Sequence, residues 1–449
     1  MPLSESHGSA AGQGPVAPLY QRLPHGPHRM APKEVVRNQR ARMHGAMIEA
    51  VAEHGYERTS VRQVVGLAGV SRRSFYEQFA NKQDCFLATF DVVAARGAWR
   101  VGAAYRAAQG DLEERLQAAF GELGEAMRSN WKGASLAILE TPVLGAPGLL
   151  RLRRATATFE GMLSGYFQHA PEASALPGPV IRGIAGGLHA AMSMCLREES
   201  ADATSELSEE MFRWTLLFQT PGAERLAERL MKRARTALAQ GRKAPNGVKP
   251  DGASAAAGGD RERLLEQALR LAVAQDYREL SAPQIADAAD VAIDAFFELF
   301  EGKEACFLAA LDMLGDELLS VAADPDLLSS DWPSAVRRTV GGLMGYLAEH
   351  PIYAQTIAGG AFAAGPLAIE RNLQLSHGIA ARLTAGAPGR ARSPFVVEGV
   401  AGAIAHTVRC QVASGQIQLL SVLSDYLSYI VLTPFIGADA AATVVEEDV

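Results

Sequence analysis

The sequence has few cysteines and no long hydrophobic run. Among its 449 residues are four cysteines, too sparse for a disulfide framework and without the CxxC spacing of a metal site. No apolar run reaches the roughly 18 residues of a membrane span. The N-terminus also lacks the continuous apolar core of a signal peptide. We therefore expect a cytoplasmic protein with no membrane partner.

Sequence motifs that carry catalysis are also missing. There is no phosphate-binding loop, no GxGxxG that opens a helix and no GxSxG elbow. The histidines lie without HExxH or ligand-spaced carboxylates, and we expect them to be satisfied helical residues: His169, His189, His350, His377 and His406. The sequence predicts no enzyme activity, no catalytic residue, no cofactor and no metal site.

The length exceeds what one hydrophobic core usually organises, so two or more domains are expected. Apolar residues recur at helical spacing in two blocks, and neither block shows sustained period-two alternation, so the fold class is predicted to be all-α. The predicted segments are a disordered basic leader (1–38), a head (39–95), a helical regulatory domain (96–240), a linker (241–259), a second head (260–316), a second regulatory domain (317–437) and a tail (438–449).

A sequence repeat relates the two blocks. The stretch TSVRQVVGLAGVSRRSFYEQFANK at 59–82 recurs 221 residues later, without a gap, as LSAPQIADAADVAIDAFFELFEGK at 280–303. The blocks also end alike, since 182–188 resembles 398–404. The duplication therefore spans whole domains.

The first copy has the pattern of a helix-turn-helix. Thr59 or Ser60 is suited to cap a short helix over 61–67, and Gly69 is free to take a positive φ in the turn that comes next. Ser71 can cap a second short helix over 72–79. In this geometry the second helix lies in the major groove of DNA.

Two sets of side chains follow from that geometry. The residues expected to read base edges are Ser71, Arg72, Arg73 and Ser74. The residues expected to contact phosphates are Thr59, Ser60, Arg62, Tyr76 and Lys82. The alternatives are that the arginines form a solvated charged face and that Tyr76 only packs. The basic leader could follow the DNA backbone, enter a minor groove, or stay solvated.

A more specific frame surrounds this motif. Its residues are Ala50, Gly55, Tyr56, Thr59, Val61, Arg62, Ala68, Gly69, Val70, Ser71, Phe75, Tyr76, Phe79, Asn81, Lys82, Phe86 and Leu87. The frame resembles the tetracycline-repressor (TetR) family of bacterial transcriptional regulators. The resemblance implies a three-helix DNA-binding head on a larger helical domain that binds a small effector and supplies a dimer face. Arg73 departs from the family, where many members have a small residue, so the bases read should differ.

The second copy keeps the core positions and loses the cations. Residues 71–74, Ser-Arg-Arg-Ser, become Ala-Ile-Asp-Ala at 292–295, and Tyr76 becomes Phe297. From 39 to 95 there are seven Lys/Arg against six Asp/Glu, whereas from 260 to 316 there are five against thirteen. An aspartate facing DNA is repelled, so the second head is expected to be a scaffold. Cys85 and Cys306 fall at equivalent positions and should be buried packing, a redox sensor being the alternative.

These observations predict two tandem TetR-like units that work as a transcriptional regulator. The expected mode is a repressor that binds double-stranded DNA through the N-terminal head and is released by a small-molecule effector. The alternative is a ligand- or partner-sensing helical module with weak DNA binding. The chain is expected to act as a homodimer or as an intramolecular pseudo-dimer, and our hypothesis is that two chains join to present two N-terminal heads. Glycine-rich helices at 183–194 and 341–362 could line effector pockets or simply pack.

Overall fold

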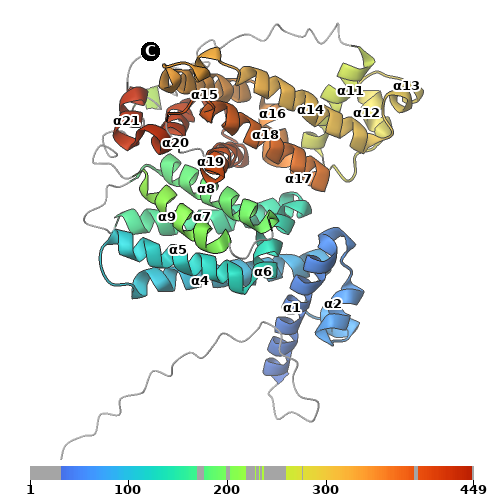
Figure 1. Ribbon diagram of the computed structural model, residues 1–449. Coiled ribbons are helices and arrows are strands. Elements are labelled where there is room, and N and C mark those ends of the chain that lie inside the picture. Colours follow the sequence, from blue (N-terminus) through green and yellow to red (C-terminus); the bar gives the residue numbers. More distant parts are fainter. Residues whose placement is uncertain are drawn as a thin grey trace, which may run out of the picture. The chain divides into compact units, whose positions relative to one another are not determined.

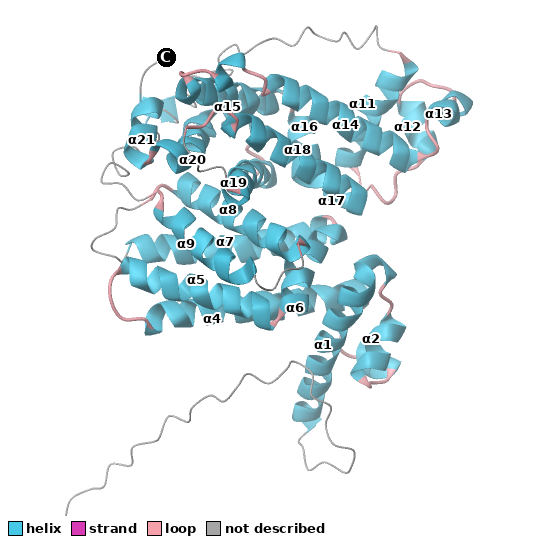
Figure 2. Ribbon diagram, viewed as in Figure 1, coloured by secondary structure: helices cyan, strands magenta, loops and turns pink. Residues whose placement is uncertain are grey.

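The computed structural model describes residues 32–168, 176–198, 203–218, 259–275, 277–388 and 393–446, with positions 228, 232, 235 and 236. Nearly all of the expected leader and linker, and His169, lie outside these residues. Within them the elements are helices and no strand occurs, as Figure 2 shows, which confirms the all-α prediction. The chain divides into two compact units, one up to Thr89 and the other from Phe90 onward, and each is described by itself.

Unit 1 is the N-terminal head. Its elements are α1 (Pro32–Arg58), α2 (Val61–Ala68), α3 (Arg72–Tyr76) and the first residues of α4 (Lys82–Ala107). Residues 32–38, expected to belong to the leader, instead form the start of α1, where Pro32 suits a helix because the first amide needs no partner. Near its end α1 kinks at Gly55, whose φ of 72° favours glycine.

Unit 2 contains the rest of the described chain (Figure 1). After α4, its first half consists of α5 (Leu112–Ser129), α6 (Trp131–Ser135), η1 (Leu136–Glu140), η2 (Thr141–Leu144), α7 (Ala146–Gln168), α8 (Gly178–Arg197) and α9 (Ala203–Leu216). Its second half begins with the second head, α11 (Asp260–Ala274), α12 (Ala282–Ala288), α13 (Ile293–Leu299) and α14 (Lys303–Val321). Then come η3 (Pro325–Leu328), α15 (Trp332–Glu349), α16 (Pro351–Gln355), η4 (Thr356–Gly360), α17 (Ala361–Ala363), α18 (Pro366–Thr384), α19 (Pro394–Ala413), η5 (Ile417–Leu419), η6 (Ser421–Leu423), α20 (Ser424–Ile436) and α21 (Ala438–Glu446).

The halves repeat one another element by element. The π-helical turns η1 and η4 occupy the same place in the order, each after a five-residue helix and separated by one short element from a long helix. The pairs α5 and α15, α7 and α18, and α8 and α19 correspond in the same way. The repeat found in the sequence is therefore a repeat of structure. The segment predicted as a tail departs from expectation, because 438–446 form α21, whose Ala441 and Val445 are fully buried.

The two halves pack together through α8 and α19, which cross at a pair of equivalent glycines. A Cβ on Gly186 would lie 2.6 Å from the carbonyl oxygen of Gly402, and a Cβ on Gly402 would lie 2.4 Å from that of Gly186. Trp214 of α9 covers the same crossing, since a Cβ on Gly399 would lie 2.9 Å from its ring. We call this packing of α8 against α19 the seam. Only backbone fits at its centre.

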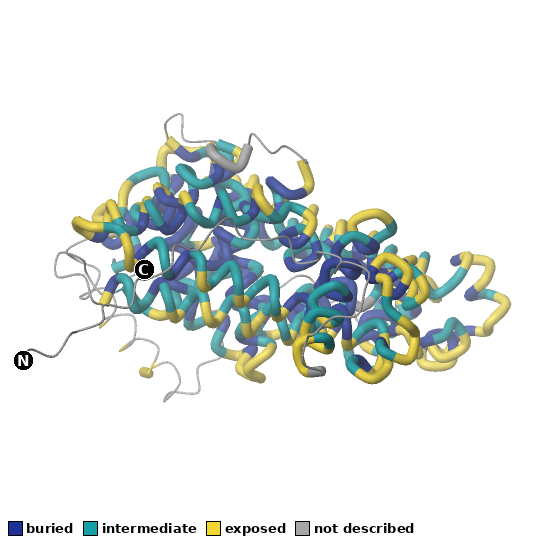
Figure 3. Tube along the Cα trace, turned by 90° about the horizontal axis from the view of Figure 1, so that it is seen from below, coloured by how far each residue is buried: buried dark blue, intermediate teal, exposed yellow. Residues whose placement is uncertain are grey.

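Burial follows these contacts, and Figure 3 shows the dark buried positions on the inner sides of the helices. One stretch, Ile417–Ile436, is long and apolar enough on average to span a membrane, although Gln418 and Asp425 interrupt it as an apolar run. More than half of it is buried inside the protein, with Tyr429 and Leu432 at 0–1% exposure. A buried core helix of a soluble protein meets the same criteria of length and composition, so the stretch is weak evidence for a membrane-spanning helix.

Candidate DNA-binding head and regulatory pocket

The α2–α3 pair of unit 1 is a helix-turn-helix, as the sequence predicts. Ser60 caps α2 in a capping box with Gln63, and Gly69 ends α2 with a φ of 62°. Ser71 caps α3 by accepting a hydrogen bond from the amide of Ser74 at 3.0 Å. Phe75 is the fully buried residue of α3, and its ring contacts that of Phe79, so α3 is anchored by its apolar side.

The predicted base-reading residues lie together on the open side of α3. Ser71, Arg72 and Arg73 are exposed and Ser74 is half-buried. The hydroxyls of Ser71 and Ser74 lie 3.0 Å apart. Arg73 donates to Glu77 at 2.9 Å, but its side chain is 89% exposed, so this ion pair is in full contact with water. Such exposed pairs contribute about 0.3–0.5 kcal/mol, little enough for a phosphate or base to replace.

The residues predicted to contact phosphates fall into two groups. Ser60, Arg62 and Tyr76 are exposed, with Tyr76 at 57%. Thr59 is only 3% exposed, and its hydroxyl donates to the carbonyls of Gly55 at 2.8 Å and Ala50 at 3.2 Å. The Thr59 side chain therefore holds the end of α1, and its predicted phosphate contact remains a prediction.

Lys82 also has an internal role. Its ammonium donates to the carbonyl oxygens of Tyr56 at 2.9 Å and Glu57 at 3.2 Å and lies 4.2 Å from the centre of the Tyr56 ring. Its equivalent, Lys303, donates to the carbonyls of Tyr277, Arg278 and Leu280 in the second head. Both heads keep these hydrogen bonds. The lysine therefore has a structural role, which is to bind the carbonyl oxygens that follow the first helix of each head or form its end. Its predicted phosphate contact remains a prediction.

The second head keeps the frame without the reading surface. Ser281 and Gln284 repeat the capping box, and Asp290 takes the place of Gly69 with a φ of 53°. On the face that corresponds to the reading surface, Ile293 and Phe297 are 38% and 54% exposed. This face offers no arginine or hydroxyl to a base edge.

The two heads also differ in how they are attached. Core residues of α11, among them Leu264 and Leu269, belong to one hydrophobic cluster with the regulatory helices of unit 2. In addition, Arg278 donates to the carbonyl of Val143 in the first half at 3.3 Å. The second head is thus part of unit 2, whereas the first head forms a unit of its own.

Buried ionisable groups in the heads have structural explanations. Burial raises the pKa of Cys85 and of Cys306 to about 12, and both thiols are fully buried, as expected for packing rather than for redox sensing. Burial, assisted by Arg40, lowers the pKa of His44 to about 4. The ring of His44 is hydrogen-bonded to Thr89 at 2.8 Å and meets Phe79 edge-on.

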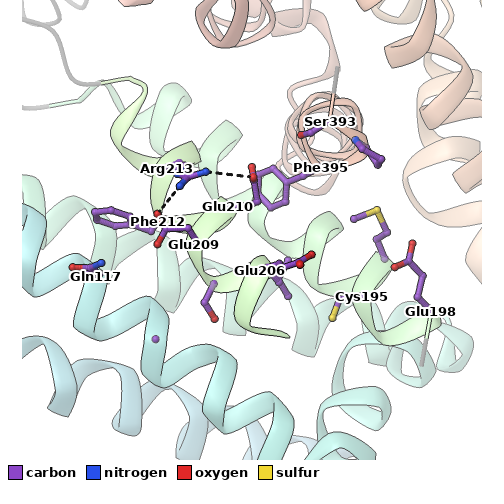
Figure 4. A pocket seen from close by; sticks show the side chains of 15 residues that line it. Gln117, Cys195, Glu198, Glu206, Glu209, Glu210, Phe212, Arg213, Ser393 and Phe395 are labelled. Carbon is purple, nitrogen blue, oxygen red and sulfur yellow. Dashed lines mark ion pairs between the residues drawn. The ribbon is translucent and has the colours of Figure 1, made fainter. Parts of the chain in front are cut away.

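Unit 2 contains a pocket of about 800 Å³ between α5, α8, α9 and the start of α19 (Figure 4). Its apolar wall includes Met194, Phe212 and Phe395. Its charged residues are Glu198, Glu206, Glu209, Glu210 and Arg213. Arg213 pairs with Glu209 at 3.0 Å and with Glu210 at 3.8 Å, as the dashed lines show. The pocket is acidic, and of the glycine-rich stretch 183–194 only Met194 lines it, since Gly183, Gly186 and Gly187 lie in tight packing contacts.

Comparison with known proteins agrees with this geometry. The model of the bacterial regulatory proteins of the tetR family matches residues 46–89 and again 264–310, the two heads. The chain is a tandem regulator of the tetR family. It is a regulator and not an enzyme. The match of its heads to this family assigns it to the DNA-binding regulators.

No curated protein matches this regulator. Among solved structures, the fatty acid degradation regulator FadR from Bacillus halodurans is similar, with 18% identity, 38% of this chain and 96% of that chain covered, and a TM-score of 0.33. The transcriptional regulator FadR from Bacillus subtilis, in complex with stearoyl-CoA, shows 16% identity, the same coverage and a TM-score of 0.34. At these values neither similarity supports the assignment of a ligand to this chain.

Proposed function

We propose that this regulator is a repressor that reads DNA through its N-terminal head alone and acts in the cytoplasm. The observation that carries the proposal is the contrast between equivalent faces. Arg72 and Arg73 stand exposed at the start of α3, whereas Ile293 and Asp294 stand at the same positions in α13. Arginine donates two hydrogen bonds to the O6 and N7 of guanine, which neither isoleucine nor aspartate can do.

We further propose that a small molecule bound in the acidic pocket controls the head. The pocket is lined by Gln117 and Gly121 of α5. Glu122 of the same helix forms an ion pair with Arg100 of α4, and α4 runs without interruption from the head into unit 2. A ligand that displaces α5 would therefore act on α4, the helix whose first residues belong to the head. Four carboxylates against one guanidinium favour a neutral or cationic effector over an anionic one.

The seam supports the pseudo-dimer form of the assembly hypothesis. In the family that the heads belong to, the regulatory domain supplies the dimer face, and here the two regulatory halves of one chain cover each other through α8 and α19. A second chain, needed to present two reading heads on a palindromic site, would then have to use a different surface. The number of chains on DNA is measured by light scattering of the isolated complex.

The test begins with genome-wide binding of the purified protein at a stated salt concentration, which supplies an operator. The double variant Arg72→Ala/Arg73→Ala is then compared with Ile293→Ala/Asp294→Ala, the matched change in the second head. Each lost base contact costs about 1–3 kcal/mol, so the first variant should bind the operator at least about 30-fold more weakly. The control should bind as the parent does.

Two results would decide against the proposal. Unchanged operator binding by the Arg72/Arg73 variant, with its helical circular dichroism intact, would reject the proposed reading head. Weak binding with no sequence preference by the parent would favour the alternative, a ligand-sensing module with poor DNA affinity. The pocket is tested separately, because it lies apart from the reading residues. An effector that binds in the pocket of about 800 Å³ should bind the Arg72→Ala/Arg73→Ala variant as well as it binds the parent.

A further inference from the structure

A cluster of metal-ligating side chains bridges the two halves of unit 2 beside the seam. Glu160 comes from α7 of the first half, and His406 and Cys410 come from α19 of the second. The carboxylate oxygen, imidazole nitrogen and thiol sulfur all lie within 4.8 Å of one another. Among the described residues this is the one such group that could hold a metal ion. None of the three side chains takes part in the reading head or the pocket.

The geometry of the cluster is close to that of a tetrahedral site. His406 and Cys410 are four residues apart on one helix, so their side chains share a face. The Nε2 of His406 lies 3.5 Å from the Sγ of Cys410, and bond lengths of about 2.1 and 2.3 Å at a tetrahedral angle require about 3.6 Å. The Oε1 of Glu160 lies 2.7 Å from the same Nε2, a hydrogen bond that would have to open by about 0.7 Å.

We propose that Glu160, His406 and Cys410 form a site for a divalent transition-metal ion of the zinc type, which ties the two halves of the chain together. One carboxylate, one imidazole and one thiolate are ligands of this class of ion, and a water would complete the four. Binding releases the thiol proton of Cys410 to solvent. The proton in the hydrogen bond between Glu160 and the Nε2 of His406 moves to the Nδ1 of the neutral ring, so that the carboxylate and Nε2 can each bind the metal.

The ligands match the charge of an ion that carries two positive charges. The carboxylate of Glu160 and the thiolate of Cys410 together neutralise it. Burial raises the pKa of the Cys410 thiol, and Glu160 also raises it, whereas Arg182, Arg409 and Arg153 act in the opposite direction. His189, whose pKa burial lowers to about 3, is neutral beside them and adds no competing charge. His406 is 8% and Glu160 20% exposed at the side chain, so the site is sheltered yet reachable.

The site exists once in each chain. Gly186 of α8 packs on the Cβ of His406, and by the same crossing Gly402 of α19 packs on the Cβ of Ala190. Ala190 thus stands where the repeat would require a histidine, and Met194 stands one helical turn further on, where it would require the cysteine. One metal ion per chain is therefore expected, not two.

The experiment uses the full-length protein, freed of metal by chelation and titrated with Co²⁺ as the probe. We expect one Co²⁺ per chain, with the near-ultraviolet absorption of a thiolate-to-cobalt bond, and displacement by Zn²⁺. Cys410→Ser should abolish that absorption, and Glu160→Gln, which keeps the shape of the side chain, should weaken binding by at least about 10-fold. The matched control is Cys195→Ser, a thiol on α8 outside the cluster.

The proposal is overturned if the parent binds no Co²⁺, binds it without thiolate absorption, or gives the same absorption after Cys410→Ser. If Cys410→Ser does not fold, Glu160→Gln decides instead, because unchanged affinity in that variant also excludes the site. The titration involves no DNA, so its outcome is independent of the proposed reading head.

Discussion

The glycine contact at the centre of the seam makes a quantitative prediction. In Gly402→Ala the new methyl group would lie 2.4 Å from the carbonyl oxygen of Gly186 and 2.5 Å from the Cβ of Ala190, about 1 Å closer than ordinary contact. The helices must separate, and overpacking of this kind costs about 1–3 kcal/mol. Alanine returns about 0.5–1 kcal/mol by lowering the entropy lost on folding. The net loss should lie between about 0 and 2.5 kcal/mol.

A control variant isolates the contribution of the seam. Gly161 lies on the exposed side of α7 with no atom within 4 Å of an added Cβ. Gly161→Ala should therefore stabilise unit 2 by about 0.5–1 kcal/mol, since only the entropy effect remains. Urea unfolding, followed by circular dichroism and tryptophan fluorescence, measures the difference.

The double variant Gly186→Ala/Gly402→Ala tests whether the two glycines share one contact. Once the first methyl has opened the seam, the second costs less, so the double loss should fall short of the sum of the single losses by about 0.5 kcal/mol or more. The midpoints should not change with protein concentration, because both sides of the seam belong to one chain. Stabilisation by Gly402→Ala equal to that of Gly161→Ala would refute the tight seam. A concentration-dependent midpoint would refute its intramolecular nature.

Three further predictions concern the heads. Asp290→Gly should stabilise the second head by about 0.5–1 kcal/mol, because glycine removes the cost of the positive φ of 53°, and Gly69→Asp should destabilise the first; thermal unfolding compares them. Thr59→Val should destabilise unit 1 by about 0.5–1.5 kcal/mol, since the carbonyls of Gly55 and Ala50 lose the one hydroxyl proton that they share, while operator affinity of the folded variant stays unchanged in a gel-shift assay. Because the pKa of His44 falls to about 4 on folding, the unfolded chain binds more protons below pH 6.5, and His44 should contribute a loss of stability of about 2 kcal/mol between pH 7.5 and 5. In urea unfolding, His44→Gln should lose less stability than the parent by that amount, while His189, whose pKa burial lowers to about 3, keeps its own contribution in both proteins.

Much of the head could be predicted because its signals are local. A serine that caps α2, a glycine at positive φ and a buried aromatic under α3 each act within a few residues of chain, and the structure places all three as expected. The duplication was equally visible, since Ser281 and Gln284 repeat the capping box at the same spacing. Such features depend on sequence neighbours alone.

The roles of individual polar residues were harder to predict, because a hydroxyl or an ammonium suits a phosphate and a buried carbonyl equally well. The second copy held the missing signal. Thr59 is replaced by Leu280, which is 2% exposed, as a buried position would be. Lys82 is retained as Lys303 in a head that has lost the arginines at positions equivalent to 72 and 73, which indicates a structural role. A residue kept where DNA contacts are lost serves the fold.

Contacts between the halves could not be read from the chain at all. The glycines of α8 and α19 are visible in the sequence, but a glycine-rich helix can either line a pocket or pack closely against another helix. The composition alone does not distinguish the two. Likewise, His406 and Cys410 lie four residues apart in the sequence, but Glu160 stands 246 residues away from the histidine that it contacts. Only the pairing of the halves brings these groups together.

The seam offers a physical reason for the loss of one reading surface. When a dimer face closes within one chain, its partner is always present at the high effective concentration of a tethered group, and assembly no longer depends on a second chain. The second head then contributes through packing: Leu264 and Leu269 fill the core of unit 2, and Arg278 holds the carbonyl of Val143. Substitutions such as arginine to Asp294 leave those contacts intact, because that side chain is exposed. The core positions of the second head are constrained by packing within unit 2. Its positions equivalent to the groove-facing residues of the first head are constrained by no side-chain hydrogen bond or ion pair in the described structure.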